Sequence, residues 1–365
     1  MYIYENSNWA NFIWDKEIIF NLLSQVKLKQ GYLLGKMDIL GFELKEKALL
    51  SVLTEDVIKS SEIEGQILNT EQVRSSIAKR LGIHLGGNIL VERSVEGIVE
   101  MMLDATQNFS KAVTEERLLG WQSAMFPSGF SGLHRIKTGC YRDDSNGPMQ
   151  VVSGAVGHDK VHYQAPDANV LKHEMDNFLN YINQENGTVD LIIKAGIVHL
   201  WFVILHPFED GNGRIARALT DMLLARSENS SNRFYSMSSR VKKVRKSYYQ
   251  ALEITQQSSL DITPWLKWFL ENLIMAIDDS EILLKSILQK AEFWQIHQNK
   301  SLNERQIKIL NKLLTDFEGN LTTIKWAKMC NCSQDTATRD IADLIDKEIL
   351  IKHGEARATH YVISF

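Results

Sequence analysis

Residues 206–217, HPFEDGNGRIAR, decide the fold and the chemistry expected of this 365-residue chain. Two glycines flank Asn212, and glycine allows backbone conformations that turn successive N–H groups toward one point as an anion nest. A helix predicted from Gly213 onward adds its positive N-terminal end to that point. Arg214 and Arg217 lie on one face of its first turn, where a cation opposes the helix dipole unless an anion is bound. The segment therefore predicts a phosphate-binding loop.

Two further side chains of the same segment are suited to phosphate chemistry. Asp210 precedes the nest, and a carboxylate beside phosphates commonly holds a Mg²⁺ ion that keeps most of its waters. His206, at the end of an apolar helix, can act as a neutral imidazole base near physiological pH. The alternatives are a surface turn or part of a calcium loop, but a calcium loop needs Glu at its twelfth position, where Arg217 stands. The combined chemistry favours a catalytic site.

Helical periodicity dominates the rest of the sequence. Thr114 before two acids and Thr263 before a proline are typical helix starts. The exception is 149–163, where two β-favouring runs flank Gly154 and Gly157 and predict a hairpin. Apolar residues recur at spacings of three and four in 18–26, 49–57, 191–205 and 219–224. The predicted fold class is therefore mainly α, a helical core with one β-hairpin.

The C-terminal residues follow a different pattern. Amphipathic helices are predicted for 304–316, 323–330 and 333–347, and two short β-like runs, 349–352 and 360–363, lie around Gly354. Helices followed by a hairpin in this order predict a winged helix. The predicted domains are 1–95, an N-terminal helical region, 96–298, the core, and 299–365, the winged helix.

Composition and charge restrict the class of protein. The chain is 44% hydrophobic and 24% charged, typical of a globular protein, and its net charge of -4 gives no general attraction to nucleic acid or anionic membranes. Three cysteines without a C-x-x-C pair argue against a disulfide framework. The apolar stretch 191–208 is interrupted by Lys194 and His199, which indicates a core helix, and the opening residues lack a signal-peptide pattern. We expect a cytoplasmic protein without membrane contact.

The segment 206–217 resembles the signature of the Fic family, H-x-F-x-[D/E]-G-N-G-R-x-x-R, at every specified position. The resemblance implies a protein adenylyltransferase, in which the histidine deprotonates a target hydroxyl that attacks the α-phosphorus of ATP. It implies His206 as the catalytic base, Asp210 as the ligand of Mg²⁺ or Mn²⁺, and Phe208 as a core anchor. It also implies that ATP phosphates are bound at Gly211, Asn212, Gly213, Arg214 and Arg217.

Residues 60–65, SSEIEG, are similar to the inhibitory motif [S/T]-x-x-x-E-[G/N] of the N-terminally regulated class of this family. The resemblance implies that Ser60, Glu64 and Gly65 form this motif and that Glu64 lies at the ATP site. By themselves the six residues also fit a glycine-capped helix end. Helix dipoles disfavour Glu64 at a helix C-terminus and Arg217 in a first turn, so a pair between them would relieve both charges.

Two other segments resemble parts of the family. The hairpin at 149–163 is similar to the flap that pairs with the backbone of the target, with Val151 and Val152 as docking residues, although an ordinary surface hairpin fits equally well. Tyr248 and Gln256 match positions near the adenine, but the family pattern has an asparagine where Gln256 stands. His199 is interpreted as a hydrogen-bonded core histidine in preference to a metal ligand.

The sequence thus predicts a protein adenylyltransferase, autoinhibited by Glu64, that acts on a serine, threonine or tyrosine hydroxyl of a protein target. Within the family, the alternatives are AMP removal and phosphoryl transfer, but relatives with the latter activity alter the G-N-G loop. A different class is a DNA-binding regulator with an idle Fic fold. Residues 301–365 contain six lysines and three arginines against five aspartates and four glutamates, so DNA binding by the tail is not favoured. Homo-oligomer formation stays open.

Overall fold

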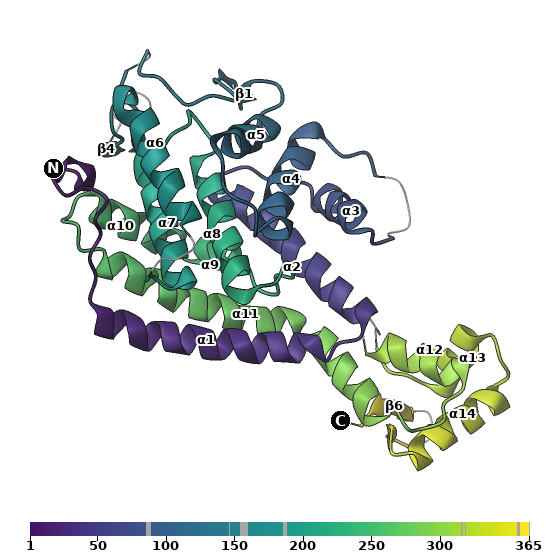
Figure 1. The fold of residues 1–365 in the computed structure, drawn as a ribbon. Helices are drawn as coiled ribbons and strands as arrows, with labels where there is room; N and C mark the ends of the chain where they lie inside the picture. The colour runs from purple at the N-terminus through teal and green to yellow at the C-terminus, as the bar shows by residue number, and fades with distance from the viewer. Residues whose placement is uncertain are drawn as a thin grey trace. The chain divides into compact units, whose positions relative to one another are not determined.

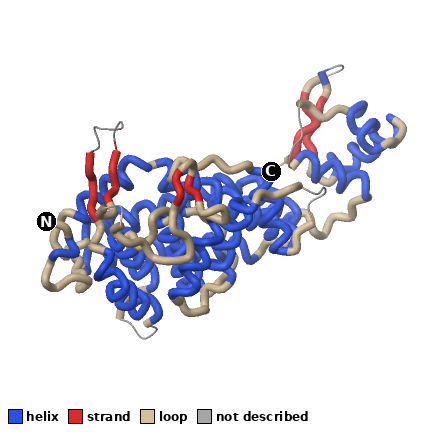
Figure 2. Tube along the Cα trace, turned by 90° about the horizontal axis from the view of Figure 1, so that it is seen from above, coloured by secondary structure: helices blue, strands red, loops and turns tan. Residues whose placement is uncertain are grey.

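The computed structural model describes residues 1–84, 89–145, 147–153, 160–184, 188–314, 317, 319–355 and 358–364. The chain divides into two compact units, one formed by Met1–Asp38 with Glu46–Glu281 and the other by Ile39–Lys45 with Ile282–Phe365. In the described part of the chain, strands are confined to three short antiparallel pairs (Figure 2). The mainly α fold class predicted from the sequence is confirmed. None of the described helices is long and apolar enough to cross a membrane.

The first unit begins with helices from the N-terminal region. A short 3₁₀ helix, η1 (Ile3–Glu5), precedes α1 (Lys16–Asp38), α2 (Phe42–Ile63) and α3 (Thr70–Leu81). Helix α1 lies alongside α11 (Thr263–Ile296) (Figure 1), and Lys36 Nζ is 3.0 Å from Glu281 Oε1. The side chain of Tyr2, beside η1, packs edge-on against Tyr163 at 5.2 Å between ring centroids. The N-terminal residues are therefore part of the folded core of this unit.

Helix α7 (Leu191–Leu205) is the centre of the first unit (Figure 1). All its residues from Ile192 onward are buried, as expected for a helix that is apolar on every side. It packs against α6 (Ala168–Asn183) and α8 (Asn212–Glu228), and α8 in turn contacts α4 (Arg93–Gln107) and α5 (Glu115–Met125). The predicted cap of α5 is confirmed, because Thr114 Oγ1 accepts the Arg117 N–H at 3.1 Å.

The predicted hairpin is confirmed as an antiparallel pair of strands, β3 (Gln150–Ser153) and β4 (Lys160–Gln164). The predicted turn glycines, Gly154 and Gly157, lie outside the described residues. Tyr163 of β4 is buried, and its hydroxyl donates to the Ile204 carbonyl of α7 at 2.8 Å. This bond fixes the base of the hairpin to the central helix. The other strand pair of this unit is β1 (Phe130–Ser131) with β2 (His134–Arg135).

Two shorter helices complete the path from α8 to α11: α9 (Met237–Lys243) and α10 (Arg245–Gln256). Gln257, just after α10, donates through Nε2 to the His162 carbonyl of β4 at 2.9 Å. Helix α10 therefore contacts the base of the hairpin.

The second unit contains α12 (Glu304–Leu313), α13 (Thr323–Cys330) and α14 (Gln334–Asp346), followed by β5 (Leu350–His353) paired with β6 (His360–Ile363). Trp326, Ile341 and Leu344 lie in its apolar core. Asp340 of α14 accepts hydrogen bonds from Arg305 Nε at 2.7 Å and Asn303 Nδ2 at 2.9 Å. One acidic group of the helix predicted for 333–347 is thus engaged inside the unit. The order of elements agrees with the sequence expectation, while the assignment as a winged helix stays a prediction.

Candidate active site

His206 follows the last residue of α7 in a left-handed backbone conformation, with φ 47° and ψ 57°. This conformation is uncommon for residues other than glycine and is often found at functional sites. The His206 N–H donates to the Phe202 carbonyl at 3.0 Å, and Nδ1 lies 3.3 Å from the Val203 carbonyl. A carbonyl can only accept, so Nδ1 carries the proton and Nε2 of the neutral ring is free to take one.

The surroundings keep the His206 ring neutral. Burial lowers its pKa below the ordinary value of 6.5, and the positive charge of Arg142 acts in the same direction. The bond to the Val203 carbonyl and the carboxylates of Glu64 and Asp210 oppose this shift without reversing it. At physiological pH His206 is therefore an unprotonated imidazole.

The loop after His206 is closed by its own side chains. Asn212 Oδ1 accepts the Phe208 N–H at 2.9 Å, and Asn212 Nδ2 donates to the Phe208 carbonyl at 2.7 Å. Phe208 is fully buried. Gly211 has φ +94°, a left-handed conformation that favours glycine, and a Cβ there would lie 2.8 Å from the movable end of the Met125 side chain. Gly211 provides no side-chain cap for α8, so the first turn of this helix keeps its potential to bind an anion.

Asp210 lies at the edge of a cavity of about 900 Å³ that Glu64, Gly65 and Arg214 also line. Its Oδ2 accepts a hydrogen bond from the Ser131 hydroxyl. No cluster of three or more potential metal ligands occurs within the described ranges. The Asp210 carboxylate in a roomy cavity fits a Mg²⁺ ion that takes its remaining ligands from phosphates and water.

Arg214 is buried under the cavity and held by three neighbours. Its Nη1 donates to Gln66 Oε1 at 2.8 Å, its Nη2 lies 3.5 Å from Asp210 Oδ1, and its guanidinium lies 4.9 Å from the centre of the Phe126 ring. Burial lowers the pKa of Arg214 despite these carboxylate contacts. An anion in the cavity would restore the favourable environment for this charge.

Arg217 is held by the segment that resembles the inhibitory motif. Its Nε donates to Ser60 Oγ at 2.9 Å, and its Nη2 donates to the Ser60 carbonyl at 2.9 Å and to Glu64 Oε1 at 2.7 Å. Burial alone would lower the pKa of Arg217, but the Glu64 carboxylate outweighs this and the pKa is raised. The pair predicted from the two helix ends is therefore present.

Glu64 also covers the start of α8. A Cβ built on Gly213 would lie only 2.1 Å from Glu64 Oε1. Helix α2 ends at Ile63, and Gly65 follows with φ +82°, a left-handed conformation that ends a helix. The Glu64 carboxylate thus lies at the helix N-terminus where an anion would otherwise bind.

Of the predicted residues, Glu64, Gly65, Asp210 and Arg214 line this cavity, and the others, His206 and Arg217 among them, do not. Tyr248 is 2% exposed and lines a small separate cavity with Arg217 and His199. Gln256, the last residue of α10, is buried. Val151 and Val152 lie on β3, and Val152 is 49% exposed. Neither valine nor Gln256 lines the cavity at Asp210.

Arg142 is a positioning residue that the sequence analysis did not identify. Its Nε donates to the His206 carbonyl at 2.8 Å and its Nη2 to the Leu205 carbonyl at 3.4 Å, while its backbone N–H donates to the Pro207 carbonyl at 2.9 Å. These carbonyls at the end of α7 would otherwise lack partners. Arg142 thus fixes the backbone that carries the histidine, and no local pattern marks it 64 positions upstream.

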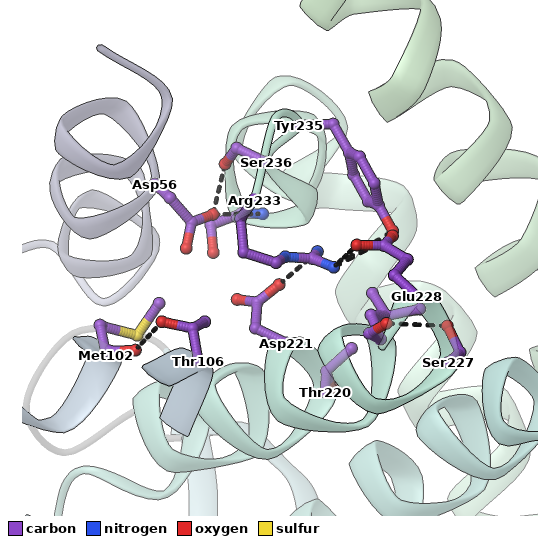
Figure 3. Close-up of polar contacts among 12 residues, drawn as sticks. Asp56, Met102, Thr106, Thr220, Asp221, Ser227, Glu228, Arg233, Tyr235 and Ser236 are labelled. Carbon is purple, nitrogen blue, oxygen red and sulfur yellow. Dashed lines mark hydrogen bonds and ion pairs between the residues drawn. The ribbon is translucent and has the colours of Figure 1, made fainter. Parts of the chain in front are cut away.

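A buried polar cluster joins α2 to α8 one turn from the Ser60 and Arg217 pair (Figure 3). Asp56 of α2 accepts from the Ser236 hydroxyl, and Asp221 Oδ1 of α8 accepts from Arg233 Nη2 at 3.1 Å. Asp221 Oδ2 is buried without a donor in the described part of the chain. Burial, followed by the charge of Asp56, raises the pKa of Asp221 well above its ordinary value. This raised pKa favours the protonated form of Asp221.

We expect Asp221→Asn to stabilise the protein more at about pH 8 than at about pH 5. In the unfolded chain Asp221 ionises near 3.8, whereas folding raises this pKa, so wild-type stability falls as pH rises between the two values. Asparagine keeps an oxygen for Arg233 and a donor for Asp56 but has no proton to lose. Thermal unfolding of both proteins across this range measures the difference. Parallel pH profiles would show that Asp221 is ionised in the folded protein.

Comparison with known proteins gives two sequence-family matches. Residues 2–83 match a domain of unknown function, DUF4172, and residues 112–224 match the Fic/DOC family. The first match contains Ser60 to Gly65, and the second contains the segment 206–217.

Two curated relatives are named as adenylyltransferases. The chain is 25% identical over 185 residues to a probable protein adenylyltransferase of Aquifex aeolicus, covering 50% of this chain and 52% of the relative. It is 38% identical over 58 residues to protein adenylyltransferase fic-1 of Caenorhabditis elegans, covering 16% of this chain and 11% of the relative. The chain thus spans about half, or less, of the length of these relatives.

Solved structures share the fold. A Fic family protein from Desulfovibrio desulfuricans, 19% identical, superposes with a TM-score of 0.58 and covers 96% of this chain and 97% of its own. A Fic domain containing signaling protein from Bacteroides thetaiotaomicron, 20% identical, has a TM-score of 0.52 over 75% of this chain and 98% of its own. Residues 112–224 are therefore a Fic/DOC family domain, and the chain that carries them has the fold of Fic family proteins.

Proposed function

We propose that this protein transfers AMP from ATP to a hydroxyl group of a protein target. The observation that carries the proposal is the close association of a neutral histidine, His206, with an uncapped helix N-terminus and two buried arginines. A base and an anion site within one loop suit nucleotidyl transfer to a hydroxyl. The names of the curated relatives support the same reaction class.

In the proposed reaction the target hydroxyl gives its proton to Nε2 of His206 as its oxygen attacks the α-phosphorus of ATP. The bond from this phosphorus to the bridging oxygen breaks, and pyrophosphate leaves. Gly211, Asn212 and Gly213 would bind phosphates through the start of α8, while Arg214 and Arg217 neutralise the leaving group. Arg142 keeps the histidine backbone in place throughout.

Asp210 would hold Mg²⁺ or Mn²⁺ together with the phosphates. When bound, this ion supplies charge neutralisation of the phosphate oxygens. The Ser131 hydroxyl orients the carboxylate for this task by its hydrogen bond to Oδ2. Asp210 also lies 3.5 Å from Arg214, so its orientation is set from two sides.

We expect Asp210→Ala to lose both AMP transfer and its dependence on divalent metal, because no cluster of three or more metal-ligating side chains among the described residues could replace this carboxylate. Initial rates over a Mg²⁺ titration measure this. Asp143→Ala removes an exposed carboxylate from a nearby loop and serves as the matched control, with rates and metal dependence unchanged. Full activity of Asp210→Ala would move the metal site to another group.

Further parts of the proposal concern regulation and the target. Glu64, with Ser60 and Gly65, would inhibit transfer by occupying Arg217 and the start of α8. The exposed side chain of Val152 and the neighbouring Val151 would dock the target backbone along β3. Tyr248 and Gln256 would lie toward the adenine end of the site. Residues 299–365 would act as a winged helix in a cytoplasmic protein.

Labelled ATP tests the reaction class. Incubation of the chain with a cell lysate should transfer label from the α-phosphate of ATP to protein, and mass spectrometry should identify the modified hydroxyl. Transfer of label from the γ-phosphate would indicate phosphoryl transfer. Absence of both labels, together with tight sequence-specific DNA binding, would favour a DNA-binding regulator with an idle Fic fold.

A further inference from the structure

A chain of hydrogen bonds behind Arg217 leads away from the inhibitory segment. It joins three helices: Thr220 lies on α8, His199 on α7 and Tyr248 on α10. Thr220 Oγ1 donates to the Ala216 carbonyl at 2.8 Å and lies 2.9 Å from His199 Nδ1. His199 Nε2 lies 2.8 Å from the Tyr248 hydroxyl. All three side chains are buried.

The donor and acceptor of each hydrogen bond in this series follow from the bond of Thr220 to the Ala216 carbonyl. The single hydroxyl proton of Thr220 is used on the Ala216 carbonyl, so Thr220 can only accept from His199 Nδ1. Burial lowers the pKa of His199 to about 3, so the ring is neutral and its Nε2 has no proton. Nε2 must therefore accept from the Tyr248 hydroxyl. The oxygen of Tyr248 keeps its lone pairs for another donor.

Arg217 has one guanidinium nitrogen that could donate to this oxygen. Its Nε and Nη2 are used on Ser60 and Glu64, but Nη1 is buried without a hydrogen-bond partner of ordinary geometry in the described ranges. Arg217, His199 and Tyr248 line the same small cavity of about 10 Å³. Burial raises the pKa of Tyr248, and the Arg217 guanidinium opposes that shift through its charge and a side-chain hydrogen bond.

We propose that His199 and Tyr248 are positioning residues that present an oxygen lone pair to Arg217 Nη1 and so, together with Ser60, hold the guanidinium in place when Glu64 leaves it. The inference rests on the proposed function, in which Glu64 leaves Arg217 and a terminal phosphate of ATP takes its place. Nη1 is the guanidinium nitrogen that neither Ser60 nor Glu64 uses in the structure, and the Tyr248 hydroxyl is the acceptor that the inference assigns to it. A guanidinium already oriented loses less entropy when it binds the phosphate.

The expected consequence is selective for the terminal phosphates. Loss of one hydrogen bond to a buried charged group should weaken ATP binding about 10-fold or more. AMP, which lacks the terminal phosphates, should bind as before, because Tyr248→Phe keeps the aromatic ring that would lie toward the adenine. A merely structural role of His199 or Tyr248 would weaken the binding of both nucleotides alike.

The test uses the full chain with Glu64→Gly, so that the competing carboxylate is absent. Into this background we would introduce Tyr248→Phe, His199→Phe and both together, and measure the Kd of a non-hydrolysable ATP analogue and of AMP by calorimetry. Tyr248→Phe keeps the aromatic ring and removes only the oxygen. Tyr249→Phe, which alters the neighbouring and partly exposed tyrosine, is the matched control.

We expect each single variant to weaken the ATP analogue but not AMP, and the double variant to be no weaker than the worse single variant, because one chain is interrupted in each case. Equal weakening of both nucleotides, or no weakening of the analogue, would overturn the inference. The binding measurement does not depend on transfer. If selective weakening occurs but Glu64→Gly transfers no AMP, the proposed function fails and the positioning role stands.

Discussion

His206→Ala should lower the rate of AMP transfer by about 10²- to 10⁴-fold, the usual effect of removing a general base. ATP should still bind, because the phosphates would contact the start of α8 and its arginines. The histidine ring acts on the attacking hydroxyl through Nε2 and makes no contact with the phosphates, because Nδ1 donates to the Val203 carbonyl. Single-turnover transfer of α-labelled AMP, with ATP binding measured in parallel, separates the two effects.

The pH profile of the wild-type protein provides a second readout of the same group. Burial lowers the pKa of His206 below 6.5, so transfer should rise with pH, reach half its maximum below that value and be constant through neutral pH. His173→Ala, on the exposed side of α6, is the control and should leave the rate and the profile unchanged. Unaltered turnover by His206→Ala would exclude the proposed mechanism.

Local sequence was sufficient to predict the conformation of the loop at 206–213, because its features depend on residues close in the chain. Gly211 requires a left-handed conformation, Asn212 bonds to the backbone four residues earlier, and α8 begins at once after them. The pair between Glu64 and Arg217 was predictable for a different reason. The expectation came from the helix dipoles, although α8 begins at Asn212, so Arg217 is its sixth residue and lies beyond the first turn, where the dipole is strongest.

Contacts between distant segments could not be predicted in this way. Arg142 binds the His206 carbonyl across 64 positions, and Ser131 binds Asp210 across 79. Neither residue belongs to a periodic or charged pattern that the fold would make visible in advance. The tautomer of His199 also depends on Thr220 and Tyr248, which come from two other helices. Such roles follow from packing, and a single sequence leaves packing undetermined.

Helix boundaries show the same division between local and distant causes. The helix predicted for 323–330 is confirmed, since Thr322 caps it and Asn331 ends it in a left-handed conformation. The helix predicted for 304–316 ends at Leu313, and residues 315 and 316 lie outside the described residues. The long helix α11 contributes to both compact units, so the division at Glu281 falls within a helix that local signals leave continuous.

Glu64→Gly should raise AMP transfer, including self-modification, by on the order of 10²-fold. In the structure Glu64 Oε1 lies 2.7 Å from Arg217 Nη2 and covers Gly213 at the start of α8. The Glu64 carboxylate repels the terminal phosphates of ATP and occupies Arg217. ATP must then bind with these phosphates in another position, which moves the α-phosphorus away from the hydroxyl near His206. A displacement of about 1 Å is enough to produce an effect of this size.

Glycine at position 64 removes the carboxylate but leaves the other partners of Arg217 intact. Ser60 still accepts from Nε and Nη2 at 2.9 Å each, so the guanidinium stays at the site with one bonding position released for phosphate. The substitution lies after the last residue of α2, where the chain already turns into the left-handed Gly65, so the fold should tolerate it. We therefore expect Glu64→Gly to stay folded and to show a higher maximal rate of AMP transfer.

Glu62→Gly is the control that separates loss of the Glu64 carboxylate at the start of α8 from a general destabilisation of the C-terminal end of α2. Glu62 lies two positions earlier and pairs with Lys59 at 2.9 Å and Lys242 at 3.6 Å, and it has no contact with Arg217 among the pairs that the structure records. We expect Glu62→Gly to leave transfer at the wild-type rate. If it activates as much as Glu64→Gly, the inhibition comes from the stability of α2. If Glu64→Gly transfers no more AMP than wild type at saturating Mg²⁺-ATP with a validated target, Ser60 to Gly65 is only a capped helix end.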